Sequence, residues 1–339
     1  MDSREQIFEL ERQVSRSVIG QEKVIRFLII SLLCKGNVLL EGLPGLAKTR
    51  AVRSLSKYLD STFRRIQFTP DLLPSDVTGT EIYVGDKGSA DASGCSSNNG
   101  FEFIPGPLFG NLILVDEINR APAKVQSALL EAMEERQVTV AGTTYPLPRL
   151  FMTMATQNPV EQEGTYPLPE AQLDRFLMKI DIDYPDKDSE KAVLRLVRGE
   201  QKEEAYATSP SDRKESETLL LSQDIIFSGW QSVANIHVSE AIEQLIVDIV
   251  HATRYGSNYS EELGQWISVG ASPRASISLE RAARANAWLD GRDFLLPDDV
   301  FAIIKPVLGH RISLSYKALA SGKKSSDIID ELLKHIVVG

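Results

Sequence analysis

The stretch that decides the fold is Gly42-Leu43-Pro44-Gly45-Leu46-Ala47-Lys48-Thr49. It follows the apolar run Val38-Leu39-Leu40 and precedes a helix-like pattern over residues 47–59. This order predicts a glycine loop that joins a buried strand to the start of a helix, as in a phosphate-binding loop. Ala47 stands where the strict pattern has glycine, and an ordinary turn is the alternative for this segment taken alone.

The residues of this loop suit the chemistry of phosphate binding. Gly42 and Gly45 would adopt the positive φ angles of a nest of backbone N–H groups. Lys48 would reach the β and γ phosphates, and the Thr49 hydroxyl would bind Mg²⁺. The dipole of the following helix would favour anions at its N-terminus. We therefore expect residues 42–50, with Arg50 included, to hold a nucleotide.

Two adjacent carboxylates end a second apolar run, Leu112-Ile113-Leu114-Val115-Asp116-Glu117. Such a run is typical of a parallel strand buried on both faces, and open α/β sheets bind ligands at the carboxyl ends of their strands. Asp116 would hold Mg²⁺ through a water, and Glu117 would orient and deprotonate an attacking water. A solvated strand end is the alternative, which the glycine loop upstream disfavours.

A neutral hydrogen-bonding side chain, that of Asn158, closes a further strand pattern in Met154-Ala155-Thr156-Gln157-Asn158-Pro159. Its position fits a sensor of the γ-phosphate. Because Asn-Pro alone is an ordinary turn signal, this interpretation depends on the order of the three motifs.

Strand patterns alternate with helix patterns up to residue 184, which predicts an α/β fold with a parallel sheet between helices. Two additional strand pairs, over residues 81–103 and 137–147, predict hairpins. Beyond residue 184 the pattern is helical, over 188–198, 240–255, 273–289, 297–307 and 326–336. We expect an α/β nucleotide-binding domain at residues 1–184 and an α-helical domain at residues 185–339.

Two segments have few apolar residues. Residues 199–214 are highly charged and predict a solvated loop. Residues 85–100 are rich in glycine, serine and asparagine and predict a mobile loop between two strands.

The composition excludes several classes of function. The 339 residues carry a formal net charge of −10, which disfavours non-specific nucleic-acid binding. Cys34, expected to be a buried thiol, and Cys95 form neither a disulfide framework nor a metal-binding pattern, which fits a reducing compartment. The N-terminus is not like a signal peptide, and no apolar run approaches the ~20 residues of a membrane span. The expected location is cytoplasmic.

Taken together, these motifs resemble the AAA+ superfamily and, within it, the MoxR family, over essentially the whole chain. Ala47 matches that family's own form of the loop. The other similar phrases are Asp116-Glu117-Ile118-Asn119-Arg120-Ala121-Pro122, Ala155-Thr156-Gln157-Asn158-Pro159, Leu168-Pro169-Glu170-Ala171-Gln172-Leu173-Asp174-Arg175-Phe176, Ser272-Pro273-Arg274-Ala275 and Leu308-Gly309-His310-Arg311. The resemblance implies a P-loop AAA+ core with inserted β-hairpins, followed by an all-helical lid.

The resemblance also implies roles for residues outside the phosphate loop. Arg175 matches the arginine finger that reaches the γ-phosphate bound in a neighbouring subunit, and Arg274 matches the second sensor arginine of the lid. Both would set fixed cations against developing phosphoryl charge, although a surface salt bridge is the alternative for each. Ile19 and Gly20 match the segment that packs on the adenine, with a simple helix–helix turn as the alternative.

The activity that the resemblance implies is Mg-ATP hydrolysis by a homo-oligomeric ring, expected to be a hexamer. Such a ring would act as a chaperone-like assembly or activation factor for a client enzyme, with a von Willebrand factor A-domain protein as partner. The two hairpins would project toward the client.

Two other functions use a related core. A nucleic-acid motor or transcription activator is disfavoured by the acidic balance and by the lack of a helix-turn-helix or zinc module. A small P-loop kinase would need neither an arginine finger nor a lid of this form.

Overall fold

A computed structural model describes residues 2–42, 48–84, 101–158, 164–206 and 220–336. Its central sheet has five parallel strands in the order β2-β5-β8-β1-β9. The strands are β1 (Val38–Gly42), β2 (Phe63–Gln67), β5 (Leu112–Asp116), β8 (Met152–Gln157) and β9 (Met178–Ile182). The predicted α/β class is confirmed.

Alternation along the strands builds a core on each face of the sheet. In β1, Val38 and Leu40 pack into one buried cluster and Leu39 into the other. All five residues of β5 are buried, as its continuous apolar run predicts. On one face lie α4 (Pro74–Thr78) and α5 (Ala123–Glu135), where Val125, Leu129 and Met133 enter the core. The strands are thereby buried on both sides.

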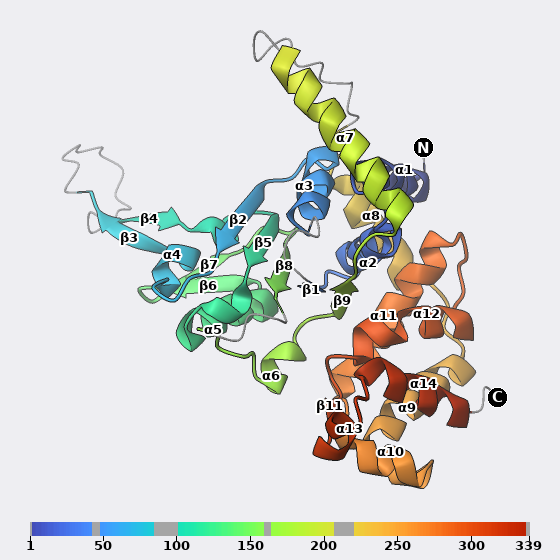
Figure 1. Cartoon of the computed structure of the whole chain (residues 1–339). Coiled ribbons are helices and arrows are strands. Elements are labelled where there is room, and N and C mark those ends of the chain that lie inside the picture. Colours follow the sequence, from blue (N-terminus) through green and yellow to red (C-terminus); the bar gives the residue numbers. More distant parts are fainter. Residues whose placement is uncertain (1, 43–47, 85–100, 159–163, 207–219, 337–339) are drawn as a thin grey trace.

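The other face is covered by helices from the N-terminal part of the chain (Figure 1). These are α1 (Ser3–Ser17), α2 (Glu22–Leu33) and α3 (Lys48–Tyr58), and a short α6 (Glu170–Leu173) precedes β9. Single 3₁₀ turns lie at Pro107–Phe109, Ile118–Arg120 and Gly256–Asn258. Cys34, which follows α2, is buried as expected, and burial raises the pKa of its thiol to about 12.

Two antiparallel hairpins extend from the sheet layer. The first pairs β3 (Gly79–Tyr83) with β4 (Phe101–Pro105), and the second pairs β6 (Gln137–Val140) with β7 (Thr143–Pro146). Figure 1 shows β3 and β4 reaching away from the body. The rings of Phe103 and Tyr145 stack with centroids 4.0 Å apart, which joins the two hairpins. Residues 85–100, the predicted mobile loop, lie outside the described residues.

Helices dominate the rest of the chain. They are α7 (Lys187–Tyr206), α8 (Asp224–Ala234), α9 (Glu240–Arg254), α10 (Glu261–Trp266), α11 (Pro273–Leu289), α12 (Pro297–Leu308), α13 (Tyr316–Ala320) and α14 (Ser325–His335), with a small pair of strands β10 (Ile267–Val269) and β11 (Ser313–Leu314). None of the helices in the described ranges is long and apolar enough to cross a membrane.

The structure corrects one expectation and adds one element here. The predicted loop 199–214 is wrong over its first part, because α7 continues to Tyr206 through residues with good helix propensity. The sequence did not predict α8, which packs on α1 and α2. A Cβ at Gly229 in α8 would lie 2.7 Å from Leu33 Cδ2, so a larger residue here would force the Leu33 side chain to move. The division of the chain near residue 184 stays a prediction.

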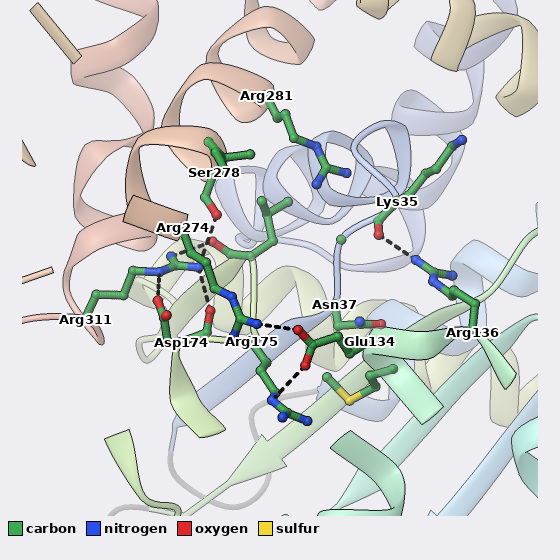
Figure 2. A pocket seen from close by; sticks show the side chains of 14 residues that line it. Lys35, Asn37, Glu134, Arg136, Asp174, Arg175, Arg274, Ser278, Arg281 and Arg311 are labelled. Atoms are coloured by element: carbon green, nitrogen blue, oxygen red, sulfur yellow. Dashed lines mark hydrogen bonds and ion pairs between the residues drawn. The ribbon is translucent and has the colours of Figure 1, made fainter. Parts of the chain in front are cut away.

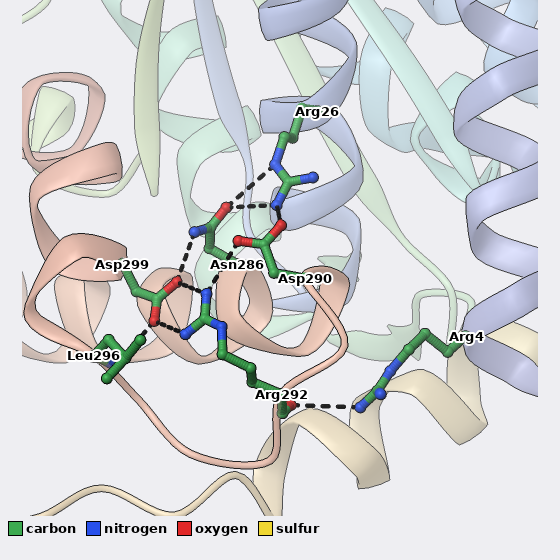
Figure 3. A network of polar contacts seen from close by, with 7 residues as sticks. All are labelled: Arg4, Arg26, Asn286, Asp290, Arg292, Leu296 and Asp299. Atoms are coloured by element: carbon green, nitrogen blue, oxygen red, sulfur yellow. Dashed lines mark hydrogen bonds and ion pairs between the residues drawn. The ribbon is translucent and has the colours of Figure 1, made fainter.

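A polar network fastens the lid to α2 (Figure 3). Asp299 is 1% exposed and accepts hydrogen bonds from Arg292, from Asn286 Nδ2 at 2.9 Å and from the Leu296 backbone N–H at 2.9 Å. The Asn286 Oδ1 atom in turn accepts from Arg26 of α2 at 2.9 Å. These hydrogen-bond donors to the buried carboxylate thus all lie in the lid. Asn286, one of these donors, is itself bonded to Arg26 of α2 and so links the carboxylate to the α/β region.

The loop after α12 contacts the start of β9 through His310. Its Nε2 atom donates to the Phe176 carbonyl at 3.1 Å, since a carbonyl can only accept. Burial, followed by the positive charge of Arg311, lowers the pKa of His310 well below its ordinary value. The folded chain therefore keeps this ring neutral.

Acidification should destabilise the chain through His310. As pH falls through about 6.5, the unfolded chain takes up a proton that the folded chain does not, so the free energy of unfolding drops by up to about 1.4 kcal/mol per pH unit. His310→Gln, which keeps a donor but does not titrate, should flatten this slope in urea titrations between about pH 7 and about pH 5. The control is His237→Gln, which removes an exposed histidine. An unchanged slope in His310→Gln would contradict this account.

Candidate nucleotide site

The carboxyl ends of three neighbouring strands bring the predicted site residues together. β1 ends at Gly42, β5 at Asp116 and β8 at Gln157, and all three run parallel in adjacent positions. Helix α3 begins at Lys48, directly beyond the glycine loop. Leu43, Pro44, Gly45, Leu46 and Ala47 lie outside the described residues, so their predicted contacts stay predictions.

Gly42 is required for a reason other than the expected one. It ends β1 without the positive φ angle that the nest was expected to need. A Cβ at this position would lie 2.7 Å from the carbonyl oxygen of Ile182 in β9 and 3.1 Å from its Cβ. Close approach of the neighbouring strand therefore excludes a side chain here, and the expectation of a positive φ was wrong for Gly42.

The Lys48 ammonium lies at the ends of β1 and β8. It donates to the Gly42 carbonyl and to the Gln157 carbonyl, the latter at 3.3 Å. Burial lowers the pKa of Lys48, while the charges of Asp116, Glu41 and Glu117 oppose this shift. The adjacent Thr49 stands in the first turn of α3, where its hydroxyl is part-buried. A cation and the start of a helix thus meet at the carboxyl ends of the strands. This is the arrangement that binds phosphate groups in proteins.

Asp116 is held in a fixed orientation at the end of β5. The residue is only 7% exposed. One carboxylate oxygen accepts from Arg65 Nε at 2.6 Å, and the other accepts from the Thr156 hydroxyl at 3.2 Å. The Glu117 backbone N–H donates to the same hydroxyl at 3.0 Å. Thr156 therefore fixes both carboxylate residues from the neighbouring strand.

Glu117 has a left-handed backbone conformation, with φ 58° and ψ 52°. Its carboxylate accepts from Gln67 Nε2 at 2.8 Å and pairs with Arg120 Nε at 3.1 Å. This strained backbone ends β5, and the side chain contacts Gln67 of the neighbouring β2 and Arg120 of the following turn. Asn158 follows β8 directly and is 8% exposed. Glu117 and Asn158 thus belong to the same edge.

Sequence reasoning missed the side chains that hold these carboxylates. Arg65 and Gln67 are spaced by two on β2, next to β5 in the sheet, so both point to one face. In the sequence, this spacing indicates only that the two side chains share a face. It does not predict that they bond to Asp116 and Glu117. Thr156 lies two residues before Asn158 in a motif that was read for its asparagine alone.

The segment around Ile19 and Gly20 lies near the same edge. Gly20 has φ +76°, and a Cβ there would lie 2.8 Å from Ser189 Cβ at the start of α7. Gln21 Nε2 donates to the Asp183 carbonyl, just beyond β9. Arg50 Nε donates to the Ser17 carbonyl at 2.7 Å, which ties α3 to the end of α1. The turn between α1 and α2 therefore borders the helix that follows the glycine loop.

Arg175 and Arg274 lie together near the amino ends of the strands, at the opposite end of the sheet from Lys48 (Figure 2). Arg175 Nε pairs with Glu134 Oε2 at 3.1 Å, and Arg274 pairs with the other oxygen of the same carboxylate. They line a cavity of about 370 Å³ beside Asn37 and Leu177, which precede β1 and β9. The structure therefore brings the two arginines to each other and separates them from Lys48. Glu134, their shared partner, was read from the sequence only as part of a helix.

The oxygen-bearing residues at the carboxyl ends of β1, β5 and β8 have the chemistry to hold a magnesium ion. Thr49 supplies a hydroxyl oxygen and Asp116 a carboxylate, the hard oxygen donors that Mg²⁺ prefers alongside waters and phosphates. Arg65 pairs with only one oxygen of Asp116, so this carboxylate would still be able to help hold the ion, directly or through a water.

Comparisons with known proteins agree with this architecture. A model of the "ATPase family associated with various cellular activities (AAA)" matches residues 37–178, and a model of the "AAA lid domain" matches residues 264–332. The chain is 41% identical over 337 residues to the chaperone MoxR1 of Mycobacterium tuberculosis, covering 98% of this chain and 83% of that protein. It is 32% identical to the protein MoxR of Paracoccus denitrificans, over 91% of this chain and 88% of the relative. The crystal structure of a candidate ATPase from Cytophaga hutchinsonii is 43% identical and superposes with a TM-score of 0.85, covering 99% and 96% of the two chains.

The sheet order, the glycine loop, the paired carboxylates and the lid define the class as AAA+. Within that class, identity over nearly the full length decides the family. The chain belongs to the MoxR family of AAA+ ATPases.

Proposed function

We propose that this chain hydrolyses Mg-ATP as part of a homo-oligomeric ring, a hexamer by our expectation, and uses the energy as a chaperone-like factor on protein clients. The observation that carries the proposal is the convergence of Lys48, Asp116, Glu117 and Asn158 at one edge of the sheet. A cytoplasmic location belongs to the same proposal.

Each residue at this end of the sheet has a proposed role that its side-chain chemistry and position support. Lys48 binds the phosphates, and Thr49 and Asp116 hold Mg²⁺, which supplies charge neutralisation when bound. Glu117 orients and deprotonates the attacking water, and Asn158 contacts the γ-phosphate. Residues 42–50 hold the nucleotide through backbone N–H groups, with Ile19 and Gly20 at the adenine.

The two arginines serve a neighbouring subunit. A five-residue strand such as β1 spans about 16 Å, so residues before β1 and β9 lie too far from Lys48 to reach the same phosphate. In a ring, however, one subunit's Arg175 and Arg274 can face the next subunit's nucleotide. Glu134 then acts as their counter-ion in the isolated subunit.

The hairpin β3–β4 supports a role in client contact. Tyr83 is 64% and Phe101 52% exposed, and they stand opposite each other with ring centroids 5.2 Å apart. Exposed aromatic pairs of this kind are frequent in protein interfaces. We propose that they contact the client or a von Willebrand factor A-domain partner. The chaperone name of the mycobacterial relative agrees with this role.

Replacing both rings should separate client capture from hydrolysis. Tyr83→Ser with Phe101→Ser, placed in a Glu117→Gln background that holds ATP, should reduce client recovery from cell extract at least about tenfold. In the wild-type background the same double substitution should leave basal turnover unchanged, because neither ring touches the nucleotide edge. Tyr316→Ser, at another exposed aromatic, is the control. Undiminished capture would remove this hairpin from the proposal.

A further inference from the structure

The most extensively bonded side chain beside the two arginines is that of Arg311, which is 8% exposed. It lies in the loop after α12 and crosses to the segment that precedes β9 (Figure 2). Its Nε donates to Asp174 Oδ1 at 2.8 Å. Its two terminal nitrogens donate to the carbonyls of Asp174 at 3.1 Å, Phe176 at 2.6 Å and Leu177 at 3.1 Å, and also to Val307 and to the Ser278 hydroxyl.

Arg311 itself has no capacity left for a ligand. A guanidinium has five N–H donors, and each of its three nitrogens is already bonded within the chain. Removing a buried guanidinium from these carbonyls would leave several acceptors unpaired. Its bonds hold residues 174, 176 and 177, on both sides of Arg175 in the sequence, while the Arg175 guanidinium pairs with Glu134 in the same cavity.

Asp174 connects this clamp to the second arginine. Its Oδ2 atom accepts from the Ser272 hydroxyl at 2.7 Å. Ser272 is the N-cap of α11, and its hydroxyl accepts in turn from the Arg274 backbone N–H at 3.1 Å. One carboxylate therefore contacts both the loop that carries Arg175 and the first turn that carries Arg274.

We propose that Asp174 and Arg311 are positioning residues that hold Arg175 and Arg274 as one rigid pair of cations for the neighbouring subunit's phosphate. This inference rests on the proposed trans role of the two arginines. This ion pair, with its buried Arg311, holds the backbone that carries both arginines before assembly. Neither arginine then has to be ordered at the moment when charge develops on the transferred phosphoryl group.

The test variant is Asp174→Asn, which keeps the size of the side chain and removes its charge. Turnover should fall about 10²-fold, the usual cost of displacing a catalytic group by about 1 Å, with a smaller change in the KM for ATP. Adding Asp174→Asn to a variant that lacks both Arg175 and Arg274 should cause little further loss, because Asp174 acts through these two arginines. Arg311→Lys, which retains the charge and loses the planar fork, should also be slow.

Mixing assigns the defect to one side of the subunit interface. Asp174→Asn mixed with Glu117→Gln should recover turnover, since an intact Glu117 can face an intact arginine pair. Asp174→Asn mixed with Arg175→Ala should stay inactive. Asp299→Asn, in the buried lid network of Figure 3, is the matched control: it loses a similar carboxylate far from Arg175 and should keep turnover per folded subunit.

The outcomes separate this inference from the proposed function. If Arg175→Ala keeps wild-type turnover, the trans role itself is wrong. If Arg175→Ala is inactive while folded Asp174→Asn and Arg311→Lys are as fast as wild type, the positioning role alone is wrong. A slow Asp174→Asn that Glu117→Gln does not rescue would also overturn it. Should Asp174→Asn not fold, Ser272→Ala, which removes one hydroxyl, must give a smaller loss with the same mixing behaviour.

Discussion

Arg175→Ala should bind ATP with nearly wild-type affinity and lose most of its turnover. Arginine fingers contribute roughly 10³–10⁵ in rate where they have been measured, and Arg175 lies too far from Lys48 to contribute to ground-state binding in its own subunit. Calorimetry gives the affinity for ATP, and phosphate release at saturating ATP gives the turnover. Both should be measured at equal degrees of assembly. Arg274→Ala should lower turnover in the same direction.

The competing explanation for Arg175 is an ordinary ion pair with Glu134 of its own chain. Arg12→Ala is the matched control, because Arg12 pairs with Glu9 at 2.6 Å on an exposed helix face. Exposed ion pairs contribute at most about 1 kcal/mol to stability. If Arg175→Ala behaves like Arg12→Ala, with a small change in stability and full turnover, Arg175 is not a finger.

Glu117→Gln should bind Mg-ATP and hydrolyse it about 10²–10⁴ times more slowly than wild type, the range for loss of a general base. The amide keeps the size of the side chain and cannot take a proton from water. Lys48→Ala, by contrast, should abolish tight binding, because the proposed role of Lys48 is to bind the phosphates in the ground state. Single-turnover hydrolysis of bound ATP separates the two defects.

Glu131→Gln provides the control for this charge change, since Glu131 is exposed on α5. If Glu117→Gln kept wild-type turnover, a group other than Glu117 would have to be the general base. Tight ATP binding by Lys48→Ala would remove Lys48 from the phosphate site.

The parts of the fold that the sequence predicts are those with a local signal. The apolar run at residues 112–115 favoured a strand buried on both faces, and the helical pattern over residues 273–289 predicted the helix that α11 forms. Helix α8 carries Ser228-Gly229 in its middle, which interrupts the helical pattern. This helix packs on α1 and α2, with Gly229 close to Leu33, so its contacts join residues far apart in the chain.

The site divides in the same way. The glycine loop and the carboxylates after β5 follow from motif and order. Their partners Arg65 and Gln67 come from a strand with no motif, and the meeting of Arg175 with Arg274 at Glu134 joins three distant segments. No local pattern contains such pairings, because they arise only when the sheet and the lid pack together.

The most direct test of the shared site is to mix Arg175→Ala with Glu117→Gln. Each variant alone should be nearly inactive. In mixed rings, an intact Glu117 of one subunit faces an intact Arg175 of the next, so hydrolysis should partly return and rise with protein concentration as subunits associate. A mixture that stays inactive at every ratio, from subunits shown to exchange and assemble together, would contradict the account.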